Sequence, residues 1–202
     1  MVALVILYVE TNFLMGIAKG QDSQAENLLR NTPNSVRLAV PSFCYVEALT
    51  TLEQGEKYNQ DFLRRLDIQI NEAQRAKKSQ PSQLLGSLLD QSRISFLERI
   101  NEIERNFYLA FNLLASKAEM ITLNPDILQG SLNRTILEKH IIDQLILECI
   151  IHHARLNIDE TKVFLSSNSK EFGKREVIEI LQDAGIQYFN KTQNLLGWLQ
   201  AQ

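Results

Sequence analysis

The stretch that decides the fold stands at the start of the chain and reads Val2-Ala3-Leu4-Val5-Ile6-Leu7-Tyr8-Val9-Glu10-Thr11-Asn12. An apolar run of this length, rich in Val and Ile and bounded by polar residues, predicts a β-strand that is buried on both faces. Parallel sheets contain strands of this kind, and their ligands bind beyond the carboxyl ends of the strands. We therefore expect Glu10 to lie at the mouth of a crevice.

The two residues after this acid have a simpler interpretation. Thr11 and Asn12 are residue types that cap helices, and a helix is expected to begin near Phe13. Capping accounts for the hydroxyl and the amide, but it does not explain why a carboxylate should end a buried strand. A functional role for Glu10 is the better explanation.

Length and composition suit one globular domain over residues 1–202. Of the 202 residues, 45% are hydrophobic, which is enough to bury a sizeable core. The net charge of -3 gives the chain no overall positive charge to attract nucleic acid, so such binding would need a local basic patch. Cys44 and Cys149 lie in apolar segments without metal-like spacing, which predicts free thiols in a reducing compartment. No segment resembles a signal peptide or a membrane span, and we expect a cytoplasmic protein with no membrane contact.

Strand patterns alternate with helix patterns along most of the chain. Besides the first strand, strands are expected at 36–40, 161–166 and 186–189. Helices are expected at 13–19, 22–29, 42–54, 141–156, 174–183 and 193–199, and a loop at 121–125. This alternation predicts an α/β fold with a parallel sheet and helices on both of its faces.

A long helical segment interrupts that rhythm between about residues 57 and 120. Two helices, roughly 59–78 and 82–118, are expected on either side of Ser79-Gln80-Pro81-Ser82. Apolar residues at steps of three and four predict core positions or a hairpin seam; they are Phe96, Ile100, Ile103, Phe107 and Phe111. The densest basic stretch also lies here, but interleaved acids favour a solvated helix face over a nucleic-acid patch; its members are Arg64, Arg65, Arg75, Lys77 and Lys78. We interpret the pair of helices as an inserted hairpin.

Acidic and amide side chains stand where predicted strands end and helices begin. Glu10 follows the first strand, Glu47 lies in the helix after the second, and Asp143 is in the first turn of a helix. Asn168 and Glu171 follow a later strand, so all five can converge at the carboxyl edge of a parallel sheet. Clustered carboxylates repel one another unless a cation neutralises them, and oxygen ligands suit Mg²⁺ or Mn²⁺. Such a metal could activate water and stabilise the charge on a phosphodiester under attack.

Some of the polar residues allow other interpretations. Asp143 in a first turn is also favoured by the helix dipole, which needs no site. His140 precedes it by three residues and is a plausible neighbour of the site. His152 and His153 are adjacent, so on a helix they point different ways and cannot form one ligand pair. No histidine lies near Ser166 in the sequence, which disfavours serine-hydrolase chemistry.

Four segments, in this order along the chain, resemble the motifs of PIN-domain nucleases. The first is a hydrophobic strand followed by an acid, Thr and Asn, the second and third place an acid in a helix, and the fourth is a strand followed by polar residues and an acid before Phe. The segments are Leu7-Tyr8-Val9-Glu10-Thr11-Asn12-Phe13-Leu14, Val40-Pro41-Ser42 with Tyr45-Val46-Glu47-Ala48-Leu49, Ile141-Ile142-Asp143-Gln144-Leu145-Ile146, and Phe164-Leu165-Ser166-Ser167-Asn168-Ser169-Lys170-Glu171-Phe172.

The resemblance implies a Rossmann-like sheet, a Mg²⁺ or Mn²⁺ ion, and hydrolysis of RNA. Carried over to this sequence, the catalytic residues would be Glu10, Glu47, Asp143 and Asn168. The metal ligands would be Glu10, Glu47, Asp143 and Glu171, and the substrate would contact Thr11, Asn12 and Ser166. The partners implied are RNA as substrate, a protein such as an antitoxin, and a second copy of the chain in a homodimer.

Three departures from the family pattern keep a second function open. The first acid is normally Asp, whereas Glu10 carries one more methylene. Asn168 takes the place of a fourth acid; its carbonyl oxygen can still bind a metal or water, but one negative charge is lost. The helical hairpin is not part of a minimal PIN domain. A catalytically degenerate module that binds RNA or a protein partner, with the hairpin as its interaction surface, fits these features, whereas a plain helical scaffold does not explain the strand ends.

Overall fold

A parallel sheet forms the centre of the protein, as the computed structural model of residues 4–133, 136 and 140–201 shows. Its strands are β1 (Val5–Val9), β2 (Val36–Pro41), β3 (Glu119–Ile121), β4 (Thr161–Leu165) and β5 (Ile186–Phe189). They lie in the order β3-β2-β1-β4-β5, and every paired strand runs parallel to its neighbour. The predicted α/β fold is therefore confirmed.

The first strand lies in the middle of this sheet. Leu7 pairs with Leu38 of β2 on one side and with Val163 of β4 on the other. All five residues of β1 are buried, because strands flank it on both edges and helices cover both faces. The strand predicted from the opening stretch is confirmed at positions 5–9, while Val2 and Ala3 lie outside the described residues.

The winding of the chain reverses at β1. From β1 the sheet grows outward through β2 to β3, and the chain then crosses to the other side of β1 to form β4 and β5. In doubly wound sheets the crevice at such a reversal, beyond the carboxyl ends of the strands, is where ligands bind. Glu10 and Ser166 directly follow β1 and β4, the two strands that meet there.

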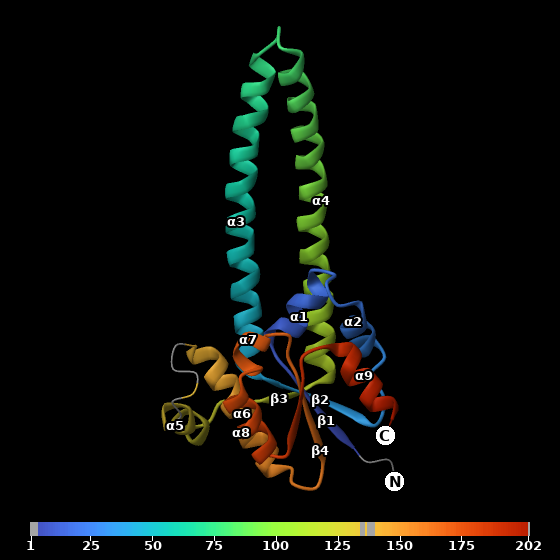
Figure 1. Ribbon diagram of the computed structural model, residues 1–202, viewed down its shortest axis with the longest axis vertical. Helices are drawn as coiled ribbons and strands as arrows, with labels where there is room; N and C mark the ends of the chain where they lie inside the picture. Colours follow the sequence, from blue (N-terminus) through green and yellow to red (C-terminus); the bar gives the residue numbers. More distant parts are fainter. Residues whose placement is uncertain (1–3, 134–135, 137–139, 202) are drawn as a thin grey trace.

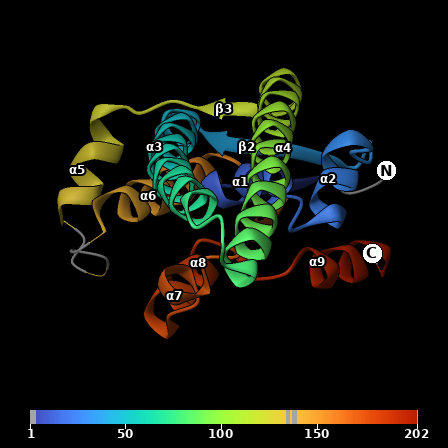
Figure 2. The ribbon, with the colours of Figure 1, turned by 90° about the horizontal axis from the view of Figure 1, so that it is seen from above.

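Helices surround the sheet and extend far beyond it. They are α1 (Thr11–Ala18), α2 (Ser23–Arg30), α3 (Ser42–Arg75), α4 (Gln80–Lys117), α5 (Pro125–Asn133), α6 (Ile141–Leu156), α7 (Ser169–Phe172), α8 (Arg175–Asp183) and α9 (Thr192–Gln200). Figure 1 shows α3 and α4 side by side as a long arm that projects from the sheet, with α1 packed against its base. Viewed from above, α5 and α6 lie on one side of the arm and α2 on the other (Figure 2). In the described part of the chain, no helix is long and apolar enough to cross a membrane.

The arm is held together by an apolar seam. Buried residues recur at steps of three and four on α3, the pattern of a coiled coil; they are Leu66, Ile70 and Ala73. The ring of Phe62 on α3 packs against that of Phe96 on α4, with centroids 4.7 Å apart. At the base of the arm, α4 joins the core of the domain through Phe107, Ala110 and Leu114. Near the tip the helices approach closely at Gly86, where an added Cβ would lie 3.4 Å from the Cβ of Ala73. The predicted helical hairpin is confirmed.

The structure differs from the sequence prediction in several elements. The helix predicted to stop near Gln54 continues without a break through Gly55 as α3, because packing against α4 outweighs the roughly 1 kcal/mol that a helical glycine costs. Strand β3 was not predicted, since it has only three residues and two of them are exposed. Helix α5 was not predicted either, although Asn124 and Pro125, the last residues of the predicted loop at 121–125, carry a start signal: Asn124 Oδ1 accepts a hydrogen bond of 2.9 Å from the backbone N–H of Ile127.

Candidate active site

Glu10 is held in one position directly after the end of β1. Its side chain is buried, and its Oε2 accepts a hydrogen bond of 2.7 Å from the backbone N–H of Asn12. That bond makes Glu10 itself the N-cap of α1, which begins at Thr11. The prediction that Thr11 and Asn12 cap a helix beginning at Phe13 was wrong, because the flexible glutamate side chain folds back over the first turn.

Ser166 connects the end of β4 to this carboxylate. Its Oγ donates a hydrogen bond of 2.8 Å to Glu10 Oε1 and accepts one of 3.1 Å from the backbone N–H of Asn168. Its carbonyl oxygen accepts a bond of 2.9 Å from the hydroxyl of Tyr188 in β5. Ser166, predicted to bind substrate, thus positions an acid in the structure.

Glu47 reaches the crevice from the second turn of α3. Its Oε2 accepts a hydrogen bond from the hydroxyl of Thr11, a residue that is itself buried. Thr11, predicted to contact substrate, therefore orients a second acid. The side chain of Asn12, the other predicted substrate contact after β1, is exposed to solvent.

Asp143 and Asn168 meet from different helices. Asp143 lies in the first turn of α6, and its Oδ1 accepts a hydrogen bond of 3.3 Å from Nδ2 of Asn168, the residue before α7. Glu171, in the one-turn helix α7, is buried and forms an ion pair with Lys174. Nε2 of His140 lies 3.4 Å from Glu171 Oε1, so this histidine neighbours the site.

The acids lie close enough to change one another's ionisation. Burial, with smaller contributions from the charges of Glu47 and Asp143, raises the pKa of Glu10 to about 7 against the hydrogen bonds from Asn12 and Ser166 that lower it. Burial, followed by the charges of Glu47 and Glu171, also raises the pKa of Asp143. The hydrogen bond from Lys174 lowers the pKa of Glu171. Glu10, Glu47, Asp143 and Glu171 thus form one electrostatic cluster, in which His140 lowers the pKa of Asp143 and Lys174 lowers that of Glu171.

The cluster suits a divalent cation by its chemistry. Within residues 4–133, 136 and 140–201, no three His, Cys, Asp or Glu side chains stand together in the arrangement of a metal site. The available donors are nevertheless carboxylate oxygens, which Mg²⁺ and Mn²⁺ prefer. Burial is the main cause of the raised pKa values of Glu10 and Asp143, and the charges of neighbouring acids add to it; a divalent cation would offset the repulsion between these acids.

A parallel sheet that reverses its winding at β1 defines a Rossmann-like α/β protein. The chain belongs to the PIN domain family, whose model matches residues 7–172. Members of this family are generally nucleases and typically use divalent metal ions. Neither curated proteins nor solved structures gave a match to this chain. The family match confirms the resemblance inferred from the four motifs and also spans the arm.

Several contacts of the site were not predicted from the sequence, among them the bond between Ser166 and Glu10. Lys174 pairs with Glu171 across the break between α7 and α8, so no helical spacing signalled the contact. The hydrogen bond between Thr11 and Glu47 joins residues 36 positions apart, and no local sequence pattern predicts it.

Proposed function

We propose that this protein is a metal-dependent ribonuclease that hydrolyses phosphodiester bonds of RNA. The observation that carries the proposal is the mutual electrostatic effect of Glu10, Glu47 and Asp143. These acids come from the end of β1, from α3 and from α6, and the charge of Glu47 raises the pKa of both Glu10 and Asp143. Burying carboxylates this near to one another costs stability, which favours a role in binding a cation.

Each residue then has a role that follows from its contacts. Glu10, Glu47 and Asp143 would hold Mg²⁺ or Mn²⁺, which supplies a Lewis acid that polarises a phosphoryl oxygen. Ser166 and the Asn12 backbone hold both oxygens of Glu10, and Thr11 holds Glu47, so the acids are oriented before any ligand arrives. With a pKa of about 7, Glu10 still carries a proton in part of the population at neutral pH, and cation binding would release it.

A thermal melt with and without Mn²⁺ is the first test. At a Mn²⁺ concentration about a hundredfold above its Kd, binding stabilises the folded state by about 2.7 kcal/mol. For a chain of this length we expect the Tm to rise by about 5–10 °C. Asp143→Asn should abolish both the rise and Mn²⁺-dependent cleavage of RNA.

Asp126→Asn is the matched control. Asp126 is also an acid in the first turn of a helix, but it is exposed on α5, so its replacement tests the helix-dipole effect alone. It should keep the rise in Tm and the cleavage. Unchanged cleavage by the Asp143→Asn variant would refute the assignment.

A second candidate is a PIN domain that binds RNA or a protein partner without cleaving it. The favouring observation is the orientation of Asn168, whose amide Nδ2, not its carbonyl oxygen, faces Asp143. An amide nitrogen cannot bind a cation, and it partly satisfies the acid in the cation's place. Under this alternative the wild type shows neither a rise in Tm with Mn²⁺ nor cleavage, while RNA or the partner still binds.

A further inference from the structure

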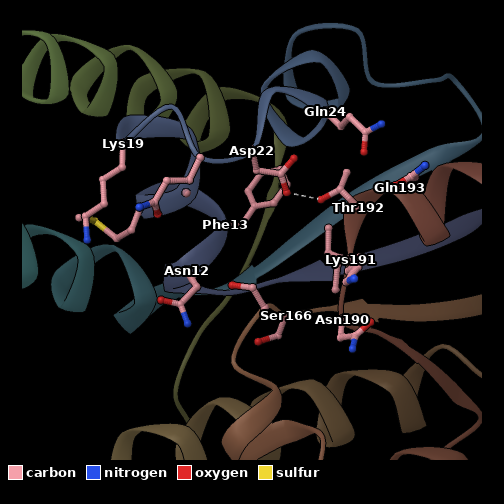
Figure 3. A pocket seen from close by; sticks show the side chains of 15 residues that line it. Asn12, Phe13, Lys19, Asp22, Gln24, Ser166, Asn190, Lys191, Thr192 and Gln193 are labelled. Atoms are coloured by element: carbon pink, nitrogen blue, oxygen red, sulfur yellow. Dashed lines mark hydrogen bonds between the residues drawn. The ribbon is translucent and has the colours of Figure 1, made fainter.

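A polar pocket opens beside the acid cluster. Its volume is about 410 Å³, and it lies between α1 and the segment that leads from β5 into α9 (Figure 3). Asn12 and Ser166 line it, and the same two residues hold Glu10 through hydrogen bonds. The pocket and the acids therefore share a wall, and a ligand in the pocket would lie next to the site. Its size is within the usual range for small-molecule sites, about 300–1,000 Å³.

The free charges of the pocket are positive. Lys19 and Lys191 line it, and within the described residues neither ammonium group forms an ion pair or hydrogen bond. The carboxylate of Asp22 also lies there, but its two oxygens are engaged: Oδ1 accepts a bond of 2.8 Å from the Ala25 N–H and Oδ2 one of 2.6 Å from the Thr192 hydroxyl. Two unpaired cations thus stand beside a cluster of acids.

The rest of the lining is rich in amides. Asn190 and Gln193 extend from the β5–α9 side and Asn12 from α1, and all three are exposed. In Figure 3, Asn12 and Ser166 lie between Lys19 on one side and the pair Asn190 and Lys191 on the other. Amides donate and accept hydrogen bonds, which suits base edges and ribose hydroxyls, while lysines suit phosphates. Together these groups match one nucleotide within a phosphodiester chain.

We propose that this pocket binds the nucleotide next to the cleaved phosphodiester, with Lys19 and Lys191 on backbone phosphates. The inference rests on the proposed ribonuclease function, because it takes the acid cluster as the place of cleavage. It implies a path for the RNA strand, which would run from the acids over Asn12 and Ser166 toward the start of α9.

The arm does not offer an equivalent surface near the site. Arg64 and Arg65 pair with Asp61, and Arg93 pairs with Asp67. The exposed lysines of the tip lie about 42 Å along α3 from the acids, at about 1.5 Å per residue from position 47 to position 75. A nucleotide adjacent to the cleaved bond cannot reach them.

Binding of a fluorescent single-stranded RNA oligonucleotide, measured by anisotropy in EDTA over a series of salt concentrations, tests the lysines. Each phosphate contact on a single strand contributes about 0.7 to the slope of log K against log salt. Replacing both Lys19 and Lys191 by Gln should weaken binding and reduce the slope by about 1.4. The paired control is Lys77→Gln with Lys78→Gln at the tip, which should leave slope and Kd unchanged.

A second variant tests the cavity without changing charge. Gly16 lines the pocket from α1, and a Cβ there would meet only the Cβ of Asp22, at an ordinary 3.8 Å. Gly16→Met should therefore fill the pocket and raise the Kd while keeping the salt slope. Gly197→Met, at a position on α9 where a Cβ meets nothing within 4 Å, is the control that should bind as the wild type does.

The outcomes separate this inference from the proposed function. Because EDTA removes the cation, RNA binding is measured apart from cleavage. If only the pocket variants lose binding, the result supports the pocket as the RNA site, whether or not the protein cleaves RNA. Unchanged binding in the Lys19 and Lys191 double variant, a loss confined to the tip variant, or no RNA binding by the wild type would each overturn it. A protein that binds through the pocket but never cleaves would refute only the nuclease.

Discussion

Replacing Glu10 by Gln should stabilise the metal-free protein above neutral pH. Burial and the neighbouring acids raise the pKa of Glu10 from an ordinary 4.5 to about 7. At about 1.4 kcal/mol for each pH unit between those values, ionising this carboxyl in the folded protein costs about 3 kcal/mol. Because the folded-state pKa is raised, the stability is fully present below pH 4.5 and is lost as the pH rises through 7.

Gln has nearly the shape of a protonated Glu, so it should keep the low-pH stability at every pH. Urea unfolding in EDTA at pH 5 and pH 8 measures the effect. The wild type should lose stability between these values, whereas the Glu10→Gln variant should be more stable than the wild type by about 3 kcal/mol at pH 8 and nearly equal to it near pH 4.5. With an m-value of about 2–3 kcal/mol/M, the midpoint at pH 8 moves by about 1 M or more.

Glu98→Gln is the control, since Glu98 is an exposed glutamate on α4 outside the acid cluster. It removes a carboxylate without relieving burial, and its pH dependence should follow the wild type. If the Glu10→Gln variant loses stability between pH 5 and pH 8 as the wild type does, the ionisation of Glu10 is not the cause of that loss and the argument is wrong.

Three further predictions concern stability. Tyr8→Phe removes the buried hydrogen bond of 2.9 Å between the Tyr8 hydroxyl and His153 Nδ1. Because the imidazole loses a partner, the free energy of unfolding in urea should fall by about 1–3 kcal/mol; no change would mean that water replaces the hydroxyl. Gly185 has a φ of 71°, so Gly185→Ala should destabilise by about 1–2 kcal/mol, whereas Gly197→Ala within α9 should be neutral or stabilising; equal effects would contradict the backbone argument. Leu114→Ala opens a cavity where α4 meets the core and should cost about 2–5 kcal/mol by calorimetry, and a loss below 1 kcal/mol would show that the site collapses around it.

Much of the fold follows from patterns that are local in the sequence. The run from Val5 to Val9 is apolar at every position, and only a strand covered on both edges and both faces tolerates that. The steps of three and four that run from Phe96 to Phe111 predicted the arm, because they place apolar groups on one side of a helix. Short or half-exposed elements carry no such signal, and β3 and the path of α3 through Gly55 were missed for this reason.

The candidate site also has a part that could be predicted from the sequence and a part that could not. Its acids were predicted because Glu10, Glu47, Asp143 and Glu171 stand at strand ends and helix starts, where a parallel sheet brings side chains together. The match of the PIN domain family over residues 7–172 supports the motifs on which that prediction rested. Their partners were not predicted: Thr11 and Ser166, which the resemblance assigned to substrate contact, form hydrogen bonds with Glu47 and Glu10 in the structure.

The sequence by itself determined the parallel sheet, the helical arm and the identity of the acids, because hydrophobic periodicity and residue type are properties of neighbouring positions. Only the tertiary structure decided how those acids ionise and what lies beside them. Ser166 contacts Glu10 across 156 positions of sequence, and Lys19 and Lys191 line one pocket from opposite ends of the chain. The pKa of Glu10 depends on burial and on charges from distant helices, and these exist only after the sheet has brought its strands together.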